Sequence, residues 1–286
     1  MNTILKDKET IFDFQTWNAS LAENNPRYRQ AQPYPHIVLN NFLEEWAAEK
    51  ALSEFPAVKD AGWIHYVQVN EKKHGLNKMD MLPLFIKQLI QELNSSPFLE
   101  FISKLTGIKN LVPDDMLEGG GLHQSKRGGF LNVHADFTVH PHKRNWRRRV
   151  NLLIYLNKDW KPDYKGDLEL WDRQMKGHQQ KISTVFNRCV IFNTDEDSYH
   201  RLPDAIECPE DIMRKSIALY YFTEEKITPK LRPTNYQARP QDGAKSALIY
   251  LDKKLIAGYT FIKSTFGIND DFVSRMLILL NRKKYT

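Results

Sequence analysis

The sequence predicts an α+β fold whose core is mainly β, with helices packed on the outside of a sandwich or jelly roll. Upstream of Leu111 the apolar residues recur at helical spacing, and downstream of it they alternate over short segments. Glycine, proline, asparagine and aspartate lie between these segments, as they do between strands. The alternating segments span residues 128–134, 150–156, 167–172, 184–193, 199–202 and 216–222.

The elements before the β region follow in order from the amino terminus. Residues 1–34 are polar and lack a clear periodicity, so we expect an irregular, poorly packed lead-in. Residues 36–39 predict a strand. The other predicted elements are a helix over 42–55 that stops at Pro56, a strand at 63–69, a helix over 82–93, and a helix from Ser96 to Leu105 that Gly107 ends.

The rest of the chain is expected to form one domain and an appendage. The domain spans residues 35–225, and a linker with a helical extension spans residues 226–286. Helical spacing recurs over 244–257 and 270–282. These helices could pack on the core, form a homodimer or lie against a membrane surface, and we expect packing or dimerisation.

Composition limits the class of protein. Hydrophobic content of 41% and aromatic content of 12% are enough for a large globular core. Charged residues interrupt the amino-terminal segment and no run reaches the ~20 apolar residues of a membrane span, so we expect a cytoplasmic protein without a transmembrane segment.

Two cysteines, Cys189 and Cys208, are too few for a disulfide framework. The net charge of +6 names no partner, and nucleic acid is not expected because only Trp146 interleaves the basic run 143–149.

One constellation indicates a metal centre. In a strand, residues two apart share a face, so His134 and Asp136 can reach one cation. His200 follows a predicted strand after a short turn and supplies a third ligand. Two imidazoles and one carboxylate can occupy one face of a six-coordinate Fe(II) and leave three positions open. Each residue alone is more often structural, and their joint occurrence favours the metal site; zinc is the competing metal.

A second feature predicts an anion site close to the metal. Arg214 begins the apolar strand that runs to Phe222, where an inward guanidinium presents the fork of donors that a buried dicarboxylate needs. Ser216 lies two residues on and faces the same way. A rim arginine is the alternative, but the apolar run argues for an inside position.

These motifs together resemble the iron(II) and 2-oxoglutarate-dependent dioxygenases of the prolyl 4-hydroxylase-like group. The similarity covers about residues 35–225 and rests on separated motifs that occur in the family's order. They are Gly128–Asp136, Asn151–Trp160, Gly166–Leu170, His200 and Arg214.

The resemblance implies a double-stranded β-helix (jelly roll) in which His134, Asp136 and His200 ligate Fe(II) and Arg214 binds the distal carboxylate of 2-oxoglutarate. It implies a hydroxylation of an unactivated C–H that consumes O2 and converts 2-oxoglutarate to succinate and CO2, with ascorbate as reductant. Members that halogenate have a small residue in place of the carboxylate, so Asp136 favours hydroxylation.

Further positions carry over less directly. Tyr155 falls where the family often places a hydroxyl on the distal carboxylate, and Ser216 assists. Gln124 or Ser125 stands where many members have a tyrosine near the metal-bound end of the cosubstrate. The family's double glycine is reduced here to Lys165-Gly166.

The substrate is the least constrained part of the prediction. In the resemblance Arg148 lies near the substrate mouth, so it could bind an anionic group such as a carboxylate or phosphate; a solvated loop is the alternative. The substrate could be a peptidyl residue such as proline, a free small molecule, or a sugar or lipid precursor. A catalytically silent jelly-roll binding module is the rival from another class.

Overall fold

A computed structural model describes residues 10–202, 204–239, 242–243, 246–251, 254–255 and 258. Its helices are α1 (Phe14–Ala19), α2 (Leu21–Gln30), α3 (Glu45–Ser53), α4 (Leu84–Leu93) and α5 (Ser96–Thr106), with 3-10 turns η1 (Met79–Met81) and η2 (Pro162–Tyr164). Its strands are β1 (His36–Asn40), β2 (Ile64–Val67), β3 (Glu71–Leu76), β4 (Leu111–Pro113), β5 (Gly121–Ser125), β6 (Phe130–Ala135), β7 (Trp146–Tyr155), β8 (Leu168–Trp171), β9 (His178–Ile182), β10 (Arg188–Asn193), β11 (His200–Leu202), β12 (Arg214–Glu224) and β13 (Asn235–Tyr236).

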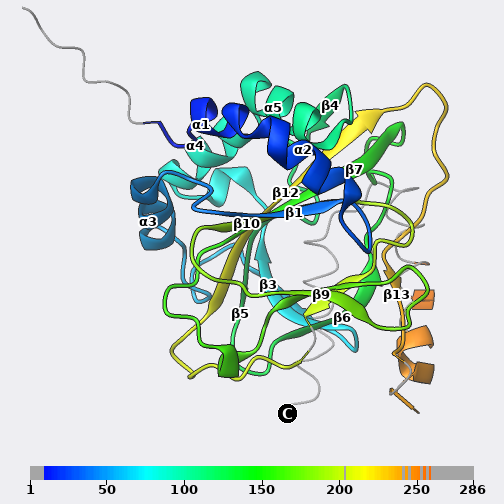
Figure 1. The fold of residues 1–286 in the computed structure, drawn as a ribbon. Coiled ribbons are helices and arrows are strands. Elements are labelled where there is room, and N and C mark those ends of the chain that lie inside the picture. Colours follow the sequence, from blue (N-terminus) through cyan, green and yellow to red (C-terminus); the bar gives the residue numbers. More distant parts are fainter. Residues whose placement is uncertain are drawn as a thin grey trace, which may run out of the picture.

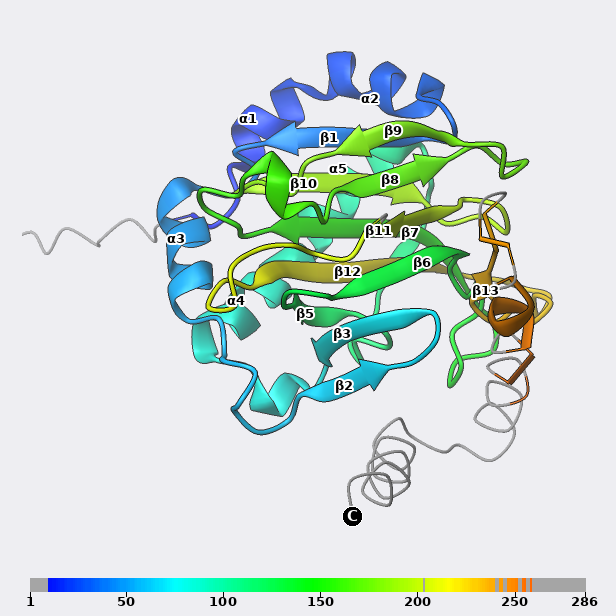
Figure 2. The same ribbon diagram turned by 90° about the horizontal axis from the view of Figure 1, so that it is seen from below.

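The strands form one antiparallel sheet that curls into a nearly closed barrel. Its order is β1-β10-β7-β12-β5-β3-β6-β11-β8-β9, with β2, β4 and β13 attached at β3, β12 and β6. Figure 2 shows these strands one above another across the molecule, with α1 and α2 along the top and α3 at the left. This arrangement confirms the predicted mainly β jelly roll, or double-stranded β-helix. The two longest strands, β7 and β12, pair with each other in this barrel.

The helices cover the outer face of the β1-β10-β7-β12 half of the sheet (Figure 1). In α4, Phe85, Leu89 and Leu93 recur at helical spacing and are buried, because one stripe of an amphipathic helix must face the core. Helix α5 packs beside it and ends at Gly107, whose φ of +78° suits a residue without Cβ. Their apolar stripes join the outward face of β7 and β12 in one core.

The amino-terminal segment corrects one prediction. Residues 10–32 are not an irregular, poorly packed lead-in: they form α1 and α2 and lie on the core. Phe12 and Tyr28 are fully buried, and the Tyr28 hydroxyl donates to Asn193 Oδ1 at 2.6 Å. The sequence shows no apolar stripe here, because α1 has no fully buried residue and α2 buries only Asn24 and Tyr28. Residues 1–9 lie outside the described part of the chain.

The carboxy-terminal segment also differs from the expected linker. Strand β13 pairs with β6, so part of residues 226–239 belongs to the sheet. Residues 246–251 are helical, within the predicted helix 244–257. The predicted helix 270–282 lies outside the described residues, and the homodimer through these helices stays a prediction. In the part of the chain that the structure describes, no helix combines the length and apolarity that a bilayer crossing needs.

Candidate metal centre

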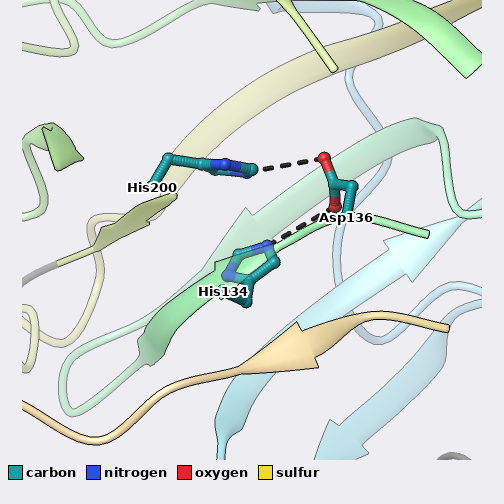
Figure 3. A group of neighbouring side chains, drawn as sticks. All are labelled: His134, Asp136 and His200. Atoms are coloured by element: carbon teal, nitrogen blue, oxygen red, sulfur yellow. Dashed lines mark ion pairs between the residues drawn. The ribbon is translucent and has the colours of Figure 1, made fainter. Parts of the chain in front are cut away.

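The sheet brings His134, Asp136 and His200 together. Strands β6 and β11 pair antiparallel with His200 opposite His134, which places both side chains on one face. His134 Nε2 lies 3.5 Å from Asp136 Oδ1, and His200 Nε2 lies 3.5 Å from Asp136 Oδ2 (Figure 3). One ligand atom from each residue lies within 4.8 Å of the others. Within the described residues this is the only group of three or more His, Cys, Asp or Glu with that geometry.

Hydrogen bonds fix which imidazole nitrogens can bind a metal. His134 Nδ1 lies 2.9 Å from the Asn132 carbonyl, and His200 Nδ1 lies 3.0 Å from the Ser198 carbonyl. A carbonyl oxygen only accepts, so each Nδ1 carries the proton and each Nε2 keeps a lone pair. Both lone pairs belong to the nitrogens nearest Asp136. The donor set therefore suits a divalent cation.

Electrostatics keep Asp136 and His200 in the forms that bind a metal ion. Burial and the neighbouring His134 lower the pKa of His200 to about 4, so its ring is neutral at neutral pH. Burial alone raises the pKa of Asp136, but the charge of Arg148 and the interaction with His200 hold it well below its ordinary value. The site thus presents one carboxylate and neutral imidazole nitrogen, the forms that coordinate metals.

Arg148 does not lie free at the substrate mouth, and this corrects its predicted role. It is 1% exposed, and its Nη2 donates to Asp136 Oδ2 at 3.0 Å. Its Nε donates to Asn151 Oδ1 at 2.8 Å, and Asn151 Nδ2 donates to the same Asp136 oxygen at 2.6 Å. The Tyr220 ring covers the guanidinium at 3.4 Å. The positive charge of Arg148 is thus paired with Oδ2 of Asp136. The other carboxylate oxygen, Oδ1, faces His134.

A bulge explains how Arg148 reaches the face that carries Asn151. Between β7 and β12 the register shifts, so that Tyr221 pairs with Val150 but Phe222 pairs with Arg148. The extra residue turns Arg148 to the same face as Asn151. Simple alternation would have put Arg149 there instead.

The pocket beside the metal ligands is lined by a buried arginine and is partly open to solvent. Tyr155, Ser216 and Arg214 line it, and Ser216 is the cross-strand neighbour of Tyr155. The Arg214 guanidinium lies 4.9 Å from the centre of the Tyr155 ring. Leu153, Leu168 and Phe192 form apolar walls of the same pocket.

Tyr155 and Arg214 interact with each other and have few other hydrogen-bond partners in the described chain. The buried Tyr155 hydroxyl makes no hydrogen bond of good geometry with a described residue. Burial raises its pKa, while its interaction with the Arg214 guanidinium opposes the rise. In the described chain, the one hydrogen bond of good geometry that Arg214 donates runs from Nε to the Gly166 carbonyl, at 2.8 Å. Buried donors that lack an acceptor of good geometry are costly, so this part of the pocket fits an anionic ligand that accepts from both.

Gly166 lies against the Arg214 side chain. A Cβ at this position would lie 3.1 Å from Arg214 Cδ, and the φ of +80° also favours glycine. The preceding Lys165 has φ +56° at the place of the family's first glycine. The reduced motif therefore keeps the glycine that touches Arg214.

Gln124 is not where the sequence suggested. Its side chain leaves the pocket and donates to the Pro56 carbonyl at 3.1 Å. Strand β5 instead turns His123 and Ser125 to the pocket, opposite Ser216 and Arg214 of β12. Sequence reasoning missed His123 as a lining residue because this strand was not predicted. Alternation through residues 121–125 would have found it.

The comparisons with known proteins agree with this geometry. Residues 120–222 match the model of the 2OG-Fe(II) oxygenase superfamily. No curated protein matches the chain. A Trichoplax adhaerens prolyl hydroxylase, solved with a hypoxia-inducible-factor peptide, aligns at TM-score 0.50 with 22% identity, over 74% of this chain and 90% of that one. A Pseudomonas putida prolyl-4-hydroxylase aligns at TM-score 0.49 with 15% identity, over 73% and 98%.

The matched segment runs from the start of β5 into β12 and carries all three metal-binding candidates and Arg214. It belongs to the 2OG-Fe(II) oxygenase superfamily, and the protein is a 2-oxoglutarate-dependent dioxygenase. The predicted resemblance to the iron(II) and 2-oxoglutarate-dependent dioxygenases is thereby confirmed, and the Trichoplax prolyl hydroxylase structure shows the same fold. Fe(II) and 2-oxoglutarate are its cofactor and cosubstrate.

Proposed function

We propose that the protein hydroxylates an unactivated C–H of a substrate not yet identified, using O2 and converting 2-oxoglutarate to succinate and CO2. His134, Asp136 and His200 hold Fe(II), which supplies the redox chemistry that couples the decarboxylation to the hydroxylation. The observation that carries the proposal is that this three-ligand group shares a pocket with a buried arginine, Arg214, whose one hydrogen bond of good geometry in the described chain goes to the Gly166 carbonyl.

The residues of the chain have separable tasks in this reaction. Arg214 and the Tyr155 hydroxyl bind the distal carboxylate of 2-oxoglutarate, and Ser216 assists from the neighbouring strand position. The apolar walls exclude water from the carbons between. The Asp136 carboxylate supports hydroxylation, because it occupies a ligand position that a halide would need.

Arg148 has no part in binding an anionic substrate in this proposal, because its charge is paired with Asp136. Peptidyl and small-molecule substrates both remain compatible with the pocket. The buried, unpaired thiols of Cys189 and Cys208 support a reducing compartment, and we propose a cytoplasmic location.

The test is succinate formation from 2-oxoglutarate by the purified protein with Fe(II) and ascorbate, without added substrate. Arg214→Lys keeps the charge but loses the fork of donors, so we expect 2-oxoglutarate affinity to fall about 10-fold to 100-fold, which corresponds to one lost charge-assisted hydrogen bond. Mn(II) affinity should stay within about twofold, because Arg214 does not touch the metal ligands.

Lys215→Ala is the matched control. Lys215 neighbours Arg214 on β12, but its Nζ lies over the Phe55 ring, outside the pocket, so the substitution should leave 2-oxoglutarate affinity unchanged. The proposed reaction would be refuted if the protein formed no succinate and if Mn(II) with 2-oxoglutarate did not raise its Tm. That result would favour the silent binding module.

A further inference from the structure

Each metal-binding histidine has an aromatic neighbour, and the two neighbours come from different parts of the chain. The His200 ring packs on Phe192 of β10, with ring centroids 5.0 Å apart. The His134 ring packs on Tyr236, with ring centroids 5.3 Å apart and a tilt of 37°. Phe192 belongs to a buried apolar cluster with Tyr155 and Leu168, whereas Tyr236 follows it by more than forty residues, in the segment expected to be a linker.

The segment that carries Tyr236 is tied to the site along its length. We call residues 232–237 the strap. The Thr138 amide donates to the Arg232 carbonyl at 3.1 Å, and the Gln237 amide donates to the Val133 carbonyl at 2.9 Å. Between these bonds, β13 pairs with β6 so that Tyr236 lies opposite His134 (pale orange strand in Figure 3).

Side chains attach the strap to the second ligand-bearing strand as well. Asn235 Nδ2 lies 3.3 Å and Gln237 Nε2 lies 3.4 Å from the hydroxyl of Tyr199, the residue before His200. Arg232 forms an ion pair with Glu196 in the turn that leads to His200. The strap therefore bridges the two strands whose histidines face each other.

This placement has a mechanical consequence for His134. Its Nδ1 bond to the Asn132 carbonyl restrains the imidazole at that one ring atom, so any further restraint on rotation of the ring comes from packing. Cross-strand neighbours on one face are in direct contact, and the Tyr236 ring is 4% exposed, so it limits that rotation. Groups that orient a ligating histidine change metal affinity although they do not touch the metal.

We propose that Tyr236 is a positioning residue of the metal centre, and that the strap is part of the catalytic domain. The ring of Tyr236 keeps the His134 imidazole at the angle that aims Nε2 at the cation. The proposal rests on the proposed function only in that a divalent metal binds His134, Asp136 and His200.

The experiment measures Mn(II) binding to the full-length protein by the loss of the free-ion electron paramagnetic resonance signal. Tyr236→Ala should weaken Mn(II) affinity about 10-fold, the lower end of the effect of removing such a neighbour. Tyr236→Phe keeps the ring and should stay within twofold of wild type. Ile227→Ala, an 85% exposed position in the same segment, is the control and should also stay within twofold.

Thermal melts separate positioning from general stability. If Tyr236 only filled space, Tyr236→Ala would lower the Tm with and without Mn(II) equally; we expect the rise in Tm on adding Mn(II) to shrink. Should Tyr236→Ala fail to fold, Tyr236→Leu replaces it, and at least a threefold loss of affinity is expected. Affinity within twofold for the Ala or Leu variant, or an equal loss in the Phe variant, overturns the proposal. Failure of wild type to bind Mn(II) would instead refute the proposed function.

Discussion

The buried pair of Arg148 and Asp136 allows the sharpest prediction. Arg148→Met keeps an unbranched stem under the Tyr220 ring but removes the charge and the bonds to Asp136 Oδ2 and Asn151 Oδ1. Removing one partner of a buried ion pair costs about 3–5 kcal/mol, because the other charge stays without a partner. Two charge-assisted hydrogen bonds at about 1.5–3 kcal/mol each give about 3–6 kcal/mol, a range that overlaps this one.

We therefore expect Arg148→Met to lower the free energy of unfolding in metal-free buffer by about 3–5 kcal/mol. Urea unfolding in the presence of a chelator measures it. Arg147→Met is the matched control, since Arg147 is exposed on the same strand and should change stability by no more than about 0.5 kcal/mol. A loss below about 1 kcal/mol for Arg148→Met would show that the arginine is not committed to Asp136 and would restore it as a substrate-binding candidate.

Two further predictions address the packing of the amino terminus and the pocket. Phe12→Ala should lower the free energy of unfolding by about 3–5 kcal/mol in urea, because Phe12 is fully buried in the main core; a change below about 1 kcal/mol would support a loosely attached lead-in. Burial, with the charges of Lys73 and Arg214, lowers the pKa of His123 to about 3, so the unfolded chain binds its proton first as the pH falls. The free energy of unfolding that neutral His123 contributes above pH about 6.5 is therefore lost as the pH falls toward about 3. In His123→Gln the free energy of unfolding should depend less steeply on pH in this window, by about 1.4 kcal/mol per pH unit. Urea unfolding at several pH values measures this slope, and an unchanged slope would refute the prediction.

The sequence alone determined the class of fold and the chemistry of the centre. Alternation after Leu111 predicted the β core, because the two faces of a strand must differ when one of them is buried. The spacing of His134 and Asp136 put both on one strand face, and the later His200 and Arg214 completed a recognisable order. The fold class could be predicted because it depends on local periodicity. The metal centre could be predicted because its histidines, aspartate and arginine occur in an order that is typical of one family.

Only the tertiary structure decided what the neighbours of those residues do. A bulge in β7 turned Arg148 to Asp136, and an unpredicted strand turned His123 rather than Gln124 into the pocket. Strand pairing across about a hundred residues brought Tyr236 onto His134. Register shifts and long-range pairings depend on the whole sheet, so no local pattern encodes them.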